Sequence, residues 1–124
     1  MNNPTPSLIC IQWNCFKLTG TRRCELINLI SDVKPHVVSL NEIKLSEPEC
    51  NYFLSLPGYS SFYKTRSKNP QHGGGVALLI KNELNPAQVN IFDIFQNDEI
   101  IGAACTLNDV RVSTFRFLLY PSAF

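Results

Sequence analysis

The segment that decides the fold runs from Leu8-Ile-Cys-Ile-Gln-Trp-Asn-Cys15 to Val37-Val-Ser-Leu40. Both ends of this segment are nearly continuous apolar runs, which is typical of strands that are buried on both faces. Between them, apolar residues recur at helical spacing over residues 21–34, and Pro35 ends that pattern. A strand, a helix and a strand in this order form a βαβ unit, so we expect the two strands to be parallel.

Further strands are expected along the rest of the chain. Residues 59–63 and 75–80 are strand-like and lie on either side of a polar, basic stretch, which favours an antiparallel pair. Three more strand-like pieces, at residues 88–92, 100–107 and 110–119, are separated by turn residues and predict a meander. The whole pattern predicts an α/β fold with a mixed sheet and one main helix.

Composition and length restrict the class of protein. The chain has 124 residues, of which 44% are hydrophobic and 17% charged, as in a globular domain with a single core. It contains neither an apolar run long enough to cross a bilayer nor a signal peptide, so we expect no membrane partner and no secretion. The cysteines number five and are never spaced C-x-x-C, which favours reduced thiols inside the cell, in the nucleus or cytoplasm.

Charge is nearly balanced overall but unevenly distributed. The net charge of +1 gives no global indication of a nucleic-acid partner. Residues 51–82, however, hold four bases and no acid, whereas residues 83–110 hold five acids and no base. One face could therefore attract phosphate while another repels it, and chance variation on solvated loops is the alternative interpretation.

Two polar residues close the strands of the predicted βαβ unit. Asn14 ends the first strand and Glu42 follows the second, and ligands gather at the carboxyl ends of parallel strands. A partly desolvated carboxylate needs a cation, a proton or a base, and Mg²⁺ is an economical partner because it prefers oxygen ligands. Alternatively, Glu42 caps the segment Ser46 to Tyr52 or pairs with Lys44, and Asn14 is a turn residue.

Other candidate motifs favour structural roles. Gly73-Gly-Gly75 precedes a strand and matches neither a P-loop nor a dinucleotide fingerprint, so it indicates a bulge or a close approach of another backbone. The two histidines, His36 and His72, lack the spacing of metal ligands. Trp13 is expected in the core, not on a base-stacking surface.

The end of the sequence suggests an incomplete sheet. Residues 110–119 form an apolar strand that is followed by only a few residues, and a sheet with one helix beside it buries one face well. We therefore expect the other face of the sheet to be poorly covered, and the chain to be part of a larger domain.

Several of these motifs, taken in order, resemble one known family. Ile11-Gln-Trp-Asn-Cys15, the run from Lys34 to Leu45, Tyr63-Lys-Thr-Arg66 and the run from Gly73 to Ile80 are similar in content and order to the endonuclease/exonuclease/phosphatase family. In particular, they resemble the apurinic-like endonuclease domain of non-LTR retrotransposons of the LINE or jockey type. The resemblance implies a four-layered α/β sandwich and a Mg²⁺-dependent phosphodiesterase that nicks DNA to prime reverse transcription.

The resemblance also implies roles for individual residues. Glu42 matches the metal-binding glutamate of the family, and Asn14 matches the asparagine that helps organise the metal and the phosphate. Tyr120, which precedes a proline, resembles the tyrosine that contacts the scissile phosphate. Basic residues of the stretch that follows residue 63 would track the DNA backbone; these are Lys64, Arg66 and Lys68.

The resemblance covers the first half of such a domain, and residues 1–124 are interpreted as that N-terminal half. The later G-D-x-N and S-D-H segments, which supply further acids and a histidine, are absent from the sequence. We therefore expect the chain alone to have little or no nuclease activity. The alternatives are a phosphatase or phosphodiesterase of the same superfamily, a non-catalytic remnant of a mobile element, and an unrelated α/β interaction module.

Overall fold

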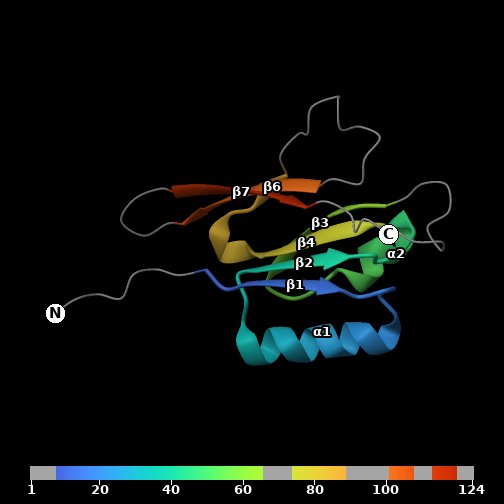
Figure 1. The fold of residues 1–124 in the computed structure, drawn as a ribbon. Helices are drawn as coiled ribbons and strands as arrows, with labels where there is room; N and C mark the ends of the chain where they lie inside the picture. The colour runs from blue at the N-terminus through green and yellow to red at the C-terminus, as the bar shows by residue number, and fades with distance from the viewer. Residues whose placement is uncertain (1–7, 66–73, 89–100, 108–112, 120–124) are drawn as a thin grey trace.

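The computed structural model describes residues 8–65, 74–88, 101–107 and 113–119. In chain order the elements are β1 (Cys10–Asn14), α1 (Gly20–Val33), β2 (Val37–Asn41), α2 (Glu47–Phe53), β3 (Tyr59–Lys64), β4 (Val76–Lys81), the 3-10 helix η2 (Asn82–Leu84), β5 (Ala87–Gln88), β6 (Ile101–Leu107) and β7 (Ser113–Leu119) (Figure 1).

The strands form two sheets. One sheet has the order β1-β2-β4-β3, in which β1 and β2 are parallel and β4 is antiparallel to both of its neighbours. The parallel βαβ unit and the antiparallel pair of β3 with β4 are therefore confirmed. The second sheet has the order β5-β6-β7 with antiparallel pairing, as the predicted meander requires. Of the strand expected at residues 88–92, all but the first residue lies outside the described residues.

Local signals in the sequence set the ends of α1. The Thr19 side chain accepts a hydrogen bond from the Arg22 backbone N–H at 3.2 Å, which is the standard N-cap interaction. At the other end Lys34 adopts a left-handed conformation, donates its backbone N–H to the Ile30 carbonyl at 2.9 Å, and precedes Pro35. The helix therefore returns the chain from the carboxyl end of β1 to the amino end of β2.

The described residues form three layers, with α1 and α2 on one face of the first sheet and the second sheet on the other (Figure 1). Side chains of β2 and β4 alternate between two hydrophobic cores. The core on the helix side includes Val38, Leu40 and Leu79, which pack with Leu26 of α1. The core between the sheets contains Val37, Val76, Leu78, Ile80, Leu84, Ala103 and Cys105.

Both faces of the central strands are thus covered, which corrects one expectation from the sequence. The sheet was expected to leave one face exposed, but Ala103 and Cys105 of β6 are buried against that face. The second sheet packs over this face, so the continuous apolar run of β4 is buried on both sides. The α/β fold with a mixed sheet is confirmed.

Two further findings concern the cysteines and the helices. Each of the five cysteines carries a free thiol. Within the described part of the chain, no helix has the length and hydrophobicity that crossing a membrane requires.

Candidate functional site

The candidate site lies at the edge of the first sheet where β1 and β2 end. In the register of the sheet, Asn14 is paired with Asn41, Asn41 with Val76, and Val76 with Lys64. These paired residues lie in one row across the four strands. The Cα atoms of Asn14 and Asn41, on neighbouring strands, are therefore about 5 Å apart, and the Cα atom of Lys64, two strands further, is about 10 Å from that of Asn41. Glu42 follows Asn41 directly, so three of the predicted site residues share one edge.

Backbone hydrogen bonds hold together the loops that leave this edge. After β1, the Cys15 N–H donates to the Asn41 carbonyl at 3.1 Å and the Leu18 N–H donates to the Ile43 carbonyl at 2.9 Å. After β2, the Ile43 N–H donates to the Gly75 carbonyl at 3.2 Å. The loop after β1, the loop after β2 and the glycines before β4 thus form one rigid unit.

The glycine run has the structural role that the sequence indicated. Gly75 has φ +85°, and a Cβ added there would lie 2.8 Å from Ile43 Cγ1. Gly74 also has a positive φ, and its carbonyl accepts from the Lys44 N–H at 3.1 Å. Glycine at position 75 therefore allows the chain after β2 to approach the start of β4 closely.

Glu42 has neither of the structural roles that the sequence left open. Ser46 caps α2, with its hydroxyl accepting from the Glu49 N–H while the Glu49 carboxylate accepts from the Ser46 N–H at 3.0 Å. Among the described residues the recorded ion pair joins Lys81 to Glu83, at 3.7 Å, and not Glu42 to Lys44. Glu42 is half-buried in a left-handed conformation with φ +54°, which is costly for any residue but glycine.

Asn14 does take part in a turn. Its Oδ1 accepts a hydrogen bond from the Phe16 backbone N–H at 3.2 Å. An amide oxygen has two lone pairs and can accept more than one bond. The neighbouring Asn41 is buried, with 4% of its surface exposed, and is the polar residue of the core at this edge. Turn formation and ligand binding by Asn14 are therefore compatible.

The donors at this edge are oxygens, which fits Mg²⁺ better than a softer metal. Mg²⁺ is commonly held by one or two carboxylates together with waters and substrate phosphate. Glu42, Asn14 and Asn41 offer one carboxylate and two amides. Among the described residues, no group of three or more His, Cys, Asp or Glu side chains that could hold a metal ion is found. Burial raises the pKa of the nearby Cys15 thiol, which stays protonated and donates to the Asn41 carbonyl at 3.3 Å.

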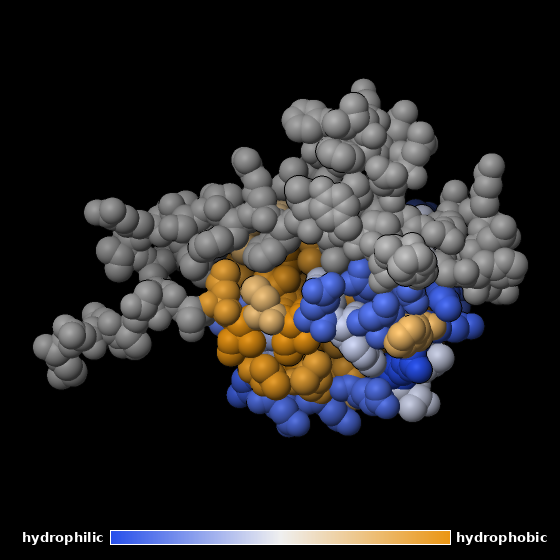
Figure 2. All heavy atoms as spheres, in the orientation of Figure 1, coloured by the Kyte–Doolittle hydropathy of each residue, from blue (hydrophilic) through white to orange (hydrophobic). Residues whose placement is uncertain are grey.

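The surface around this edge is polar and basic. Figure 2 shows hydrophilic residues over the right-hand end of the molecule, where β1 and β2 end, and hydrophobic residues toward the left. Lys17 and Arg22 follow β1, Lys44 follows β2, and Lys64 ends β3. The edge therefore carries several cations together with the acid Glu42. The pKa of the Glu49 carboxyl on α2 is lowered by hydrogen bonds from Ser46 and also by Lys17, which is close enough to act on it.

The remaining predicted residues fall into two groups. Tyr120, Arg66, Lys68 and His72 lie outside the described residues. His36 lies at the opposite edge, before β2, where its Nδ1 accepts from the Ile9 N–H at 3.0 Å. Trp13 is partly buried against the helix-side core, as expected.

Reasoning from the sequence did not assign Phe16 or Arg22 to the candidate site, and it considered Lys44 only as an ion-pair partner of Glu42. The sequence held one usable signal, because an aromatic residue and a lysine come directly after the strand that carries Asn14. The position of Lys44 depends on the pairing of β2 with β4, which brings its loop against Gly74.

A hollow of about 300 Å³ lies elsewhere, between β1 and α1. It is lined by Ile11, Gln12, Trp13, Glu25, Leu26 and Leu29. This lining is mainly apolar and gathers no cluster of cations, so the hollow is unsuited to phosphate, and the strand ends are the better candidate site.

Comparison with known proteins agrees with this architecture. The family model described as "Endonuclease/Exonuclease/phosphatase family" matches residues 11–121, so the chain belongs to this family. The family match excludes an unrelated α/β interaction module. A search of curated proteins found no match.

Solved structures show the same fold at low sequence identity. The AP endonuclease LMAP of Leishmania major is 17% identical with a TM-score of 0.67, over 93% of this chain and 39% of that protein. The APE2 catalytic domain of Xenopus laevis is 14% identical with a TM-score of 0.61, over 89% and 44%. The 3' phosphatase NExo of Neisseria, solved with a product DNA hairpin, is 19% identical with a TM-score of 0.58, over 90% and 40%. The chain therefore spans about two fifths of the length of these structures.

Proposed function

We propose that this chain is part of a Mg²⁺-dependent phosphodiesterase that cleaves DNA, of the apurinic-like endonuclease kind. The observation that carries the proposal is the placement of Asn14 beside Asn41 and Glu42 at the ends of parallel neighbours, in a chain of this family. Structural neighbours that include AP endonucleases and a phosphatase bound to DNA support DNA as the substrate class.

Each residue predicted from the sequence has a part in this proposal. Glu42 and Asn14 would hold Mg²⁺ through their side-chain oxygens. Bound Mg²⁺ would supply positive charge to the scissile phosphate. Lys64, with Arg66 and Lys68, would follow the DNA backbone by charge attraction, and Tyr120 would contact the scissile phosphate.

We further propose that the cleavage is target nicking by a retrotransposon-type protein inside the cell, in the nucleus or cytoplasm. The motif order described above supports this role, and the free thiols agree with a reducing compartment.

Binding of Mg²⁺ tests the metal site. By calorimetry, Glu42→Gln should bind Mg²⁺ about tenfold more weakly than the native chain, because an amide lacks the negative charge that attracts a hard cation. Asp32→Asn, at an exposed acid on α1, is the matched control and should bind like the native chain. Equal affinity of the native chain and Glu42→Gln would remove Glu42 from the site.

Salt dependence of DNA binding separates the nuclease from a phosphatase of a non-nucleic-acid substrate. For the nuclease, the logarithm of the affinity should fall linearly with the logarithm of the salt concentration, and Lys64→Gln should reduce that slope by about one. A slope near zero would favour phosphomonoester chemistry on another substrate.

Activity and unfolding of the chain test the remaining alternative, a non-catalytic remnant. We expect little or no nicking of supercoiled plasmid by this chain alone, because acids and a histidine of the family's later motifs are absent from its sequence. A cooperative thermal transition in circular dichroism would support an autonomous unit, whereas a gradual change would favour a remnant.

A further inference from the structure

An exposed phenylalanine stands beside the candidate site. Phe16 follows β1 with 63% of its surface exposed, and its backbone N–H is bonded to Asn14 Oδ1 at 3.2 Å. Both Phe16 and Lys17 have positive φ, +54° and +142°, which disfavours residues other than glycine. An aromatic ring exposed to water lacks the stabilising free energy that burial of its apolar surface would give. Backbone strain of this kind clusters at functional positions.

An arginine lies over the ring. Arg22, in the first turn of α1, donates from Nη1 to the Cys15 carbonyl, and its guanidinium carbon lies 6.0 Å from the centre of the Phe16 ring. The first bond fixes the arginine to the backbone directly before Phe16. One face of the ring is therefore backed by a cation, as in the aromatic and arginine surfaces on which nucleobases stack.

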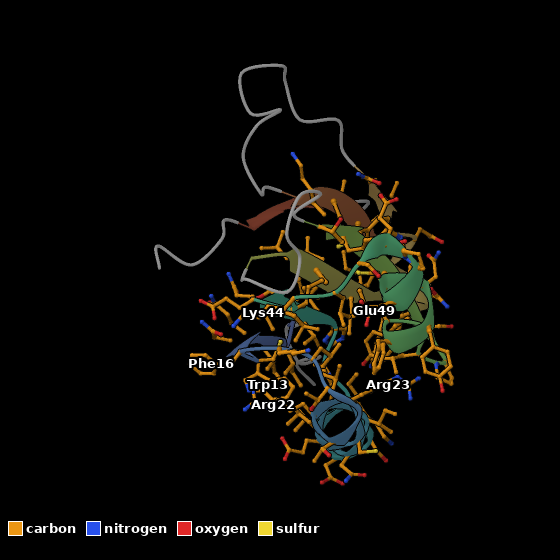
Figure 3. The ribbon with its side chains drawn as sticks, turned by 90° about the vertical axis from the view of Figure 1, so that its right-hand side faces the viewer. Trp13, Phe16, Arg22, Arg23, Lys44 and Glu49 are labelled. Carbon is orange, nitrogen blue, oxygen red and sulfur yellow. The ribbon has the colours of Figure 1, made fainter. Side chains whose placement is uncertain are left out.

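Both loops that leave this edge also carry lysines. Lys17 follows Phe16 in the chain, and Lys44 lies on the loop after β2. The two loops are joined by a hydrogen bond from the Leu18 N–H to the Ile43 carbonyl at 2.9 Å. Figure 3, which faces the carboxyl ends of β1 and β2, shows Phe16, Arg22 and Lys44 on one side of the molecule, with Arg23 and Glu49 on the other. This combination of an exposed ring and several cations is complementary to a base flanked by phosphates.

A second exposed aromatic residue provides the contrast. Tyr52 of α2 is 71% exposed and lies under Arg23, whose guanidinium carbon is 5.7 Å from the ring centre. Its helix, however, carries Glu47 and Glu49 in the first turn. Tyr52 therefore has the same aromatic and arginine chemistry in an acidic setting, where phosphate would be repelled.

We infer that Phe16 is a stacking residue for an unstacked base of the DNA strand bound at the Asn14 and Glu42 edge. This inference rests on the proposed function and adds a preference to it: the favoured substrate has an unpaired or displaced base next to the phosphate at the site. Lys17 and Lys44 contact the phosphates on either side of that base.

Fluorescence anisotropy with labelled oligothymidylate, in EDTA so that no hydrolysis occurs, tests the inference. Phe16→Ala should weaken binding of the single strand about tenfold, because that is the usual effect of losing one base stack. Phe16→Trp should restore the affinity, and binding of a duplex should change less than twofold. Tyr52→Ala is the matched control and should bind like the native chain.

The opposite results overturn the inference. Equal single-strand affinity of Phe16→Ala and the native chain, or an equal loss for Tyr52→Ala, would show that the position of the ring does not matter. A lower melting temperature of Phe16→Ala without loss of affinity would assign the ring to packing. Because Mg²⁺ is absent from this assay, a failed metal test with Glu42→Gln and a failed stacking test are distinguishable.

Discussion

The two ends of the first sheet use left-handed residues for different purposes. At the end where β2 begins, Lys34 terminates α1, Asn85 terminates η2 and Gly58 forms the turn before β3. Each of these left-handed residues closes a helix or a turn, which is their common structural use.

At the other end, where β1 and β2 finish, four residues other than glycine have positive φ and none of them ends a helix; these are Phe16, Lys17, Glu42 and Lys44. Their strain is maintained by the hydrogen bonds between the loops. The comparison teaches that backbone strain alone does not indicate function. A better indicator of function is backbone strain at charged or aromatic residues that do not end a helix or form a turn.

The largest expected effect concerns the glycine that lets these loops meet. Gly75→Ala should lower the free energy of unfolding by roughly 2–5 kcal/mol, because the new Cβ meets Ile43 Cγ1 and φ is +85°. Urea denaturation measures this change.

Gly58→Ala measures the cost of backbone strain without a steric clash, because Gly58 has φ +82° but open space around it. It should cost only about 1–2 kcal/mol. An equal loss of unfolding free energy in the two variants would show that the loops tolerate a side chain at position 75. The close contact inferred between these loops would then be contradicted.

The next effect tests whether Glu42 stabilises the fold. Ser46→Ala should cost about 1 kcal/mol because it removes the N-cap of α2. Glu42→Gln should change the free energy of unfolding by less than about 0.5 kcal/mol, since it leaves the cap intact. A larger loss for Glu42→Gln than for Ser46→Ala, measured by thermal melting, would make Glu42 a structural residue.

The smallest effect compares one left-handed residue from each end. Lys34→Gly and Glu42→Gly should each raise the free energy of unfolding by about 0.5–1 kcal/mol, because glycine accepts positive φ. Only Glu42→Gly should also lose Mg²⁺ binding in calorimetry. Loss of Mg²⁺ binding in both variants would mean that the two ends do not differ in function.

Much of the fold was predictable because its signals are local. Apolar runs marked β1, β2 and β4, helical spacing with Pro35 marked α1, and turn residues marked the strands of the meander. The cover that β6 provides for the first sheet was not predictable, because it depends on how two distant sheets pack.

The candidate site was predictable in part. Asn14 and Glu42 could be placed at one edge because consecutive parallel strands end on the same side. The setting of Phe16 and Lys44 could not be predicted, since it depends on hydrogen bonds between loops that are far apart in the sequence.

The sequence by itself determined the order of strands and helices, the parallel βαβ unit and the edge at which its polar residues emerge, because each follows from residue periodicity and chain direction. Only the tertiary structure decided that Lys64 joins the row of Asn14, that Gly75 lies against Ile43, and that Phe16 stands exposed among cations. These features arise from long-range pairing and strained backbone, which neighbouring residues do not specify.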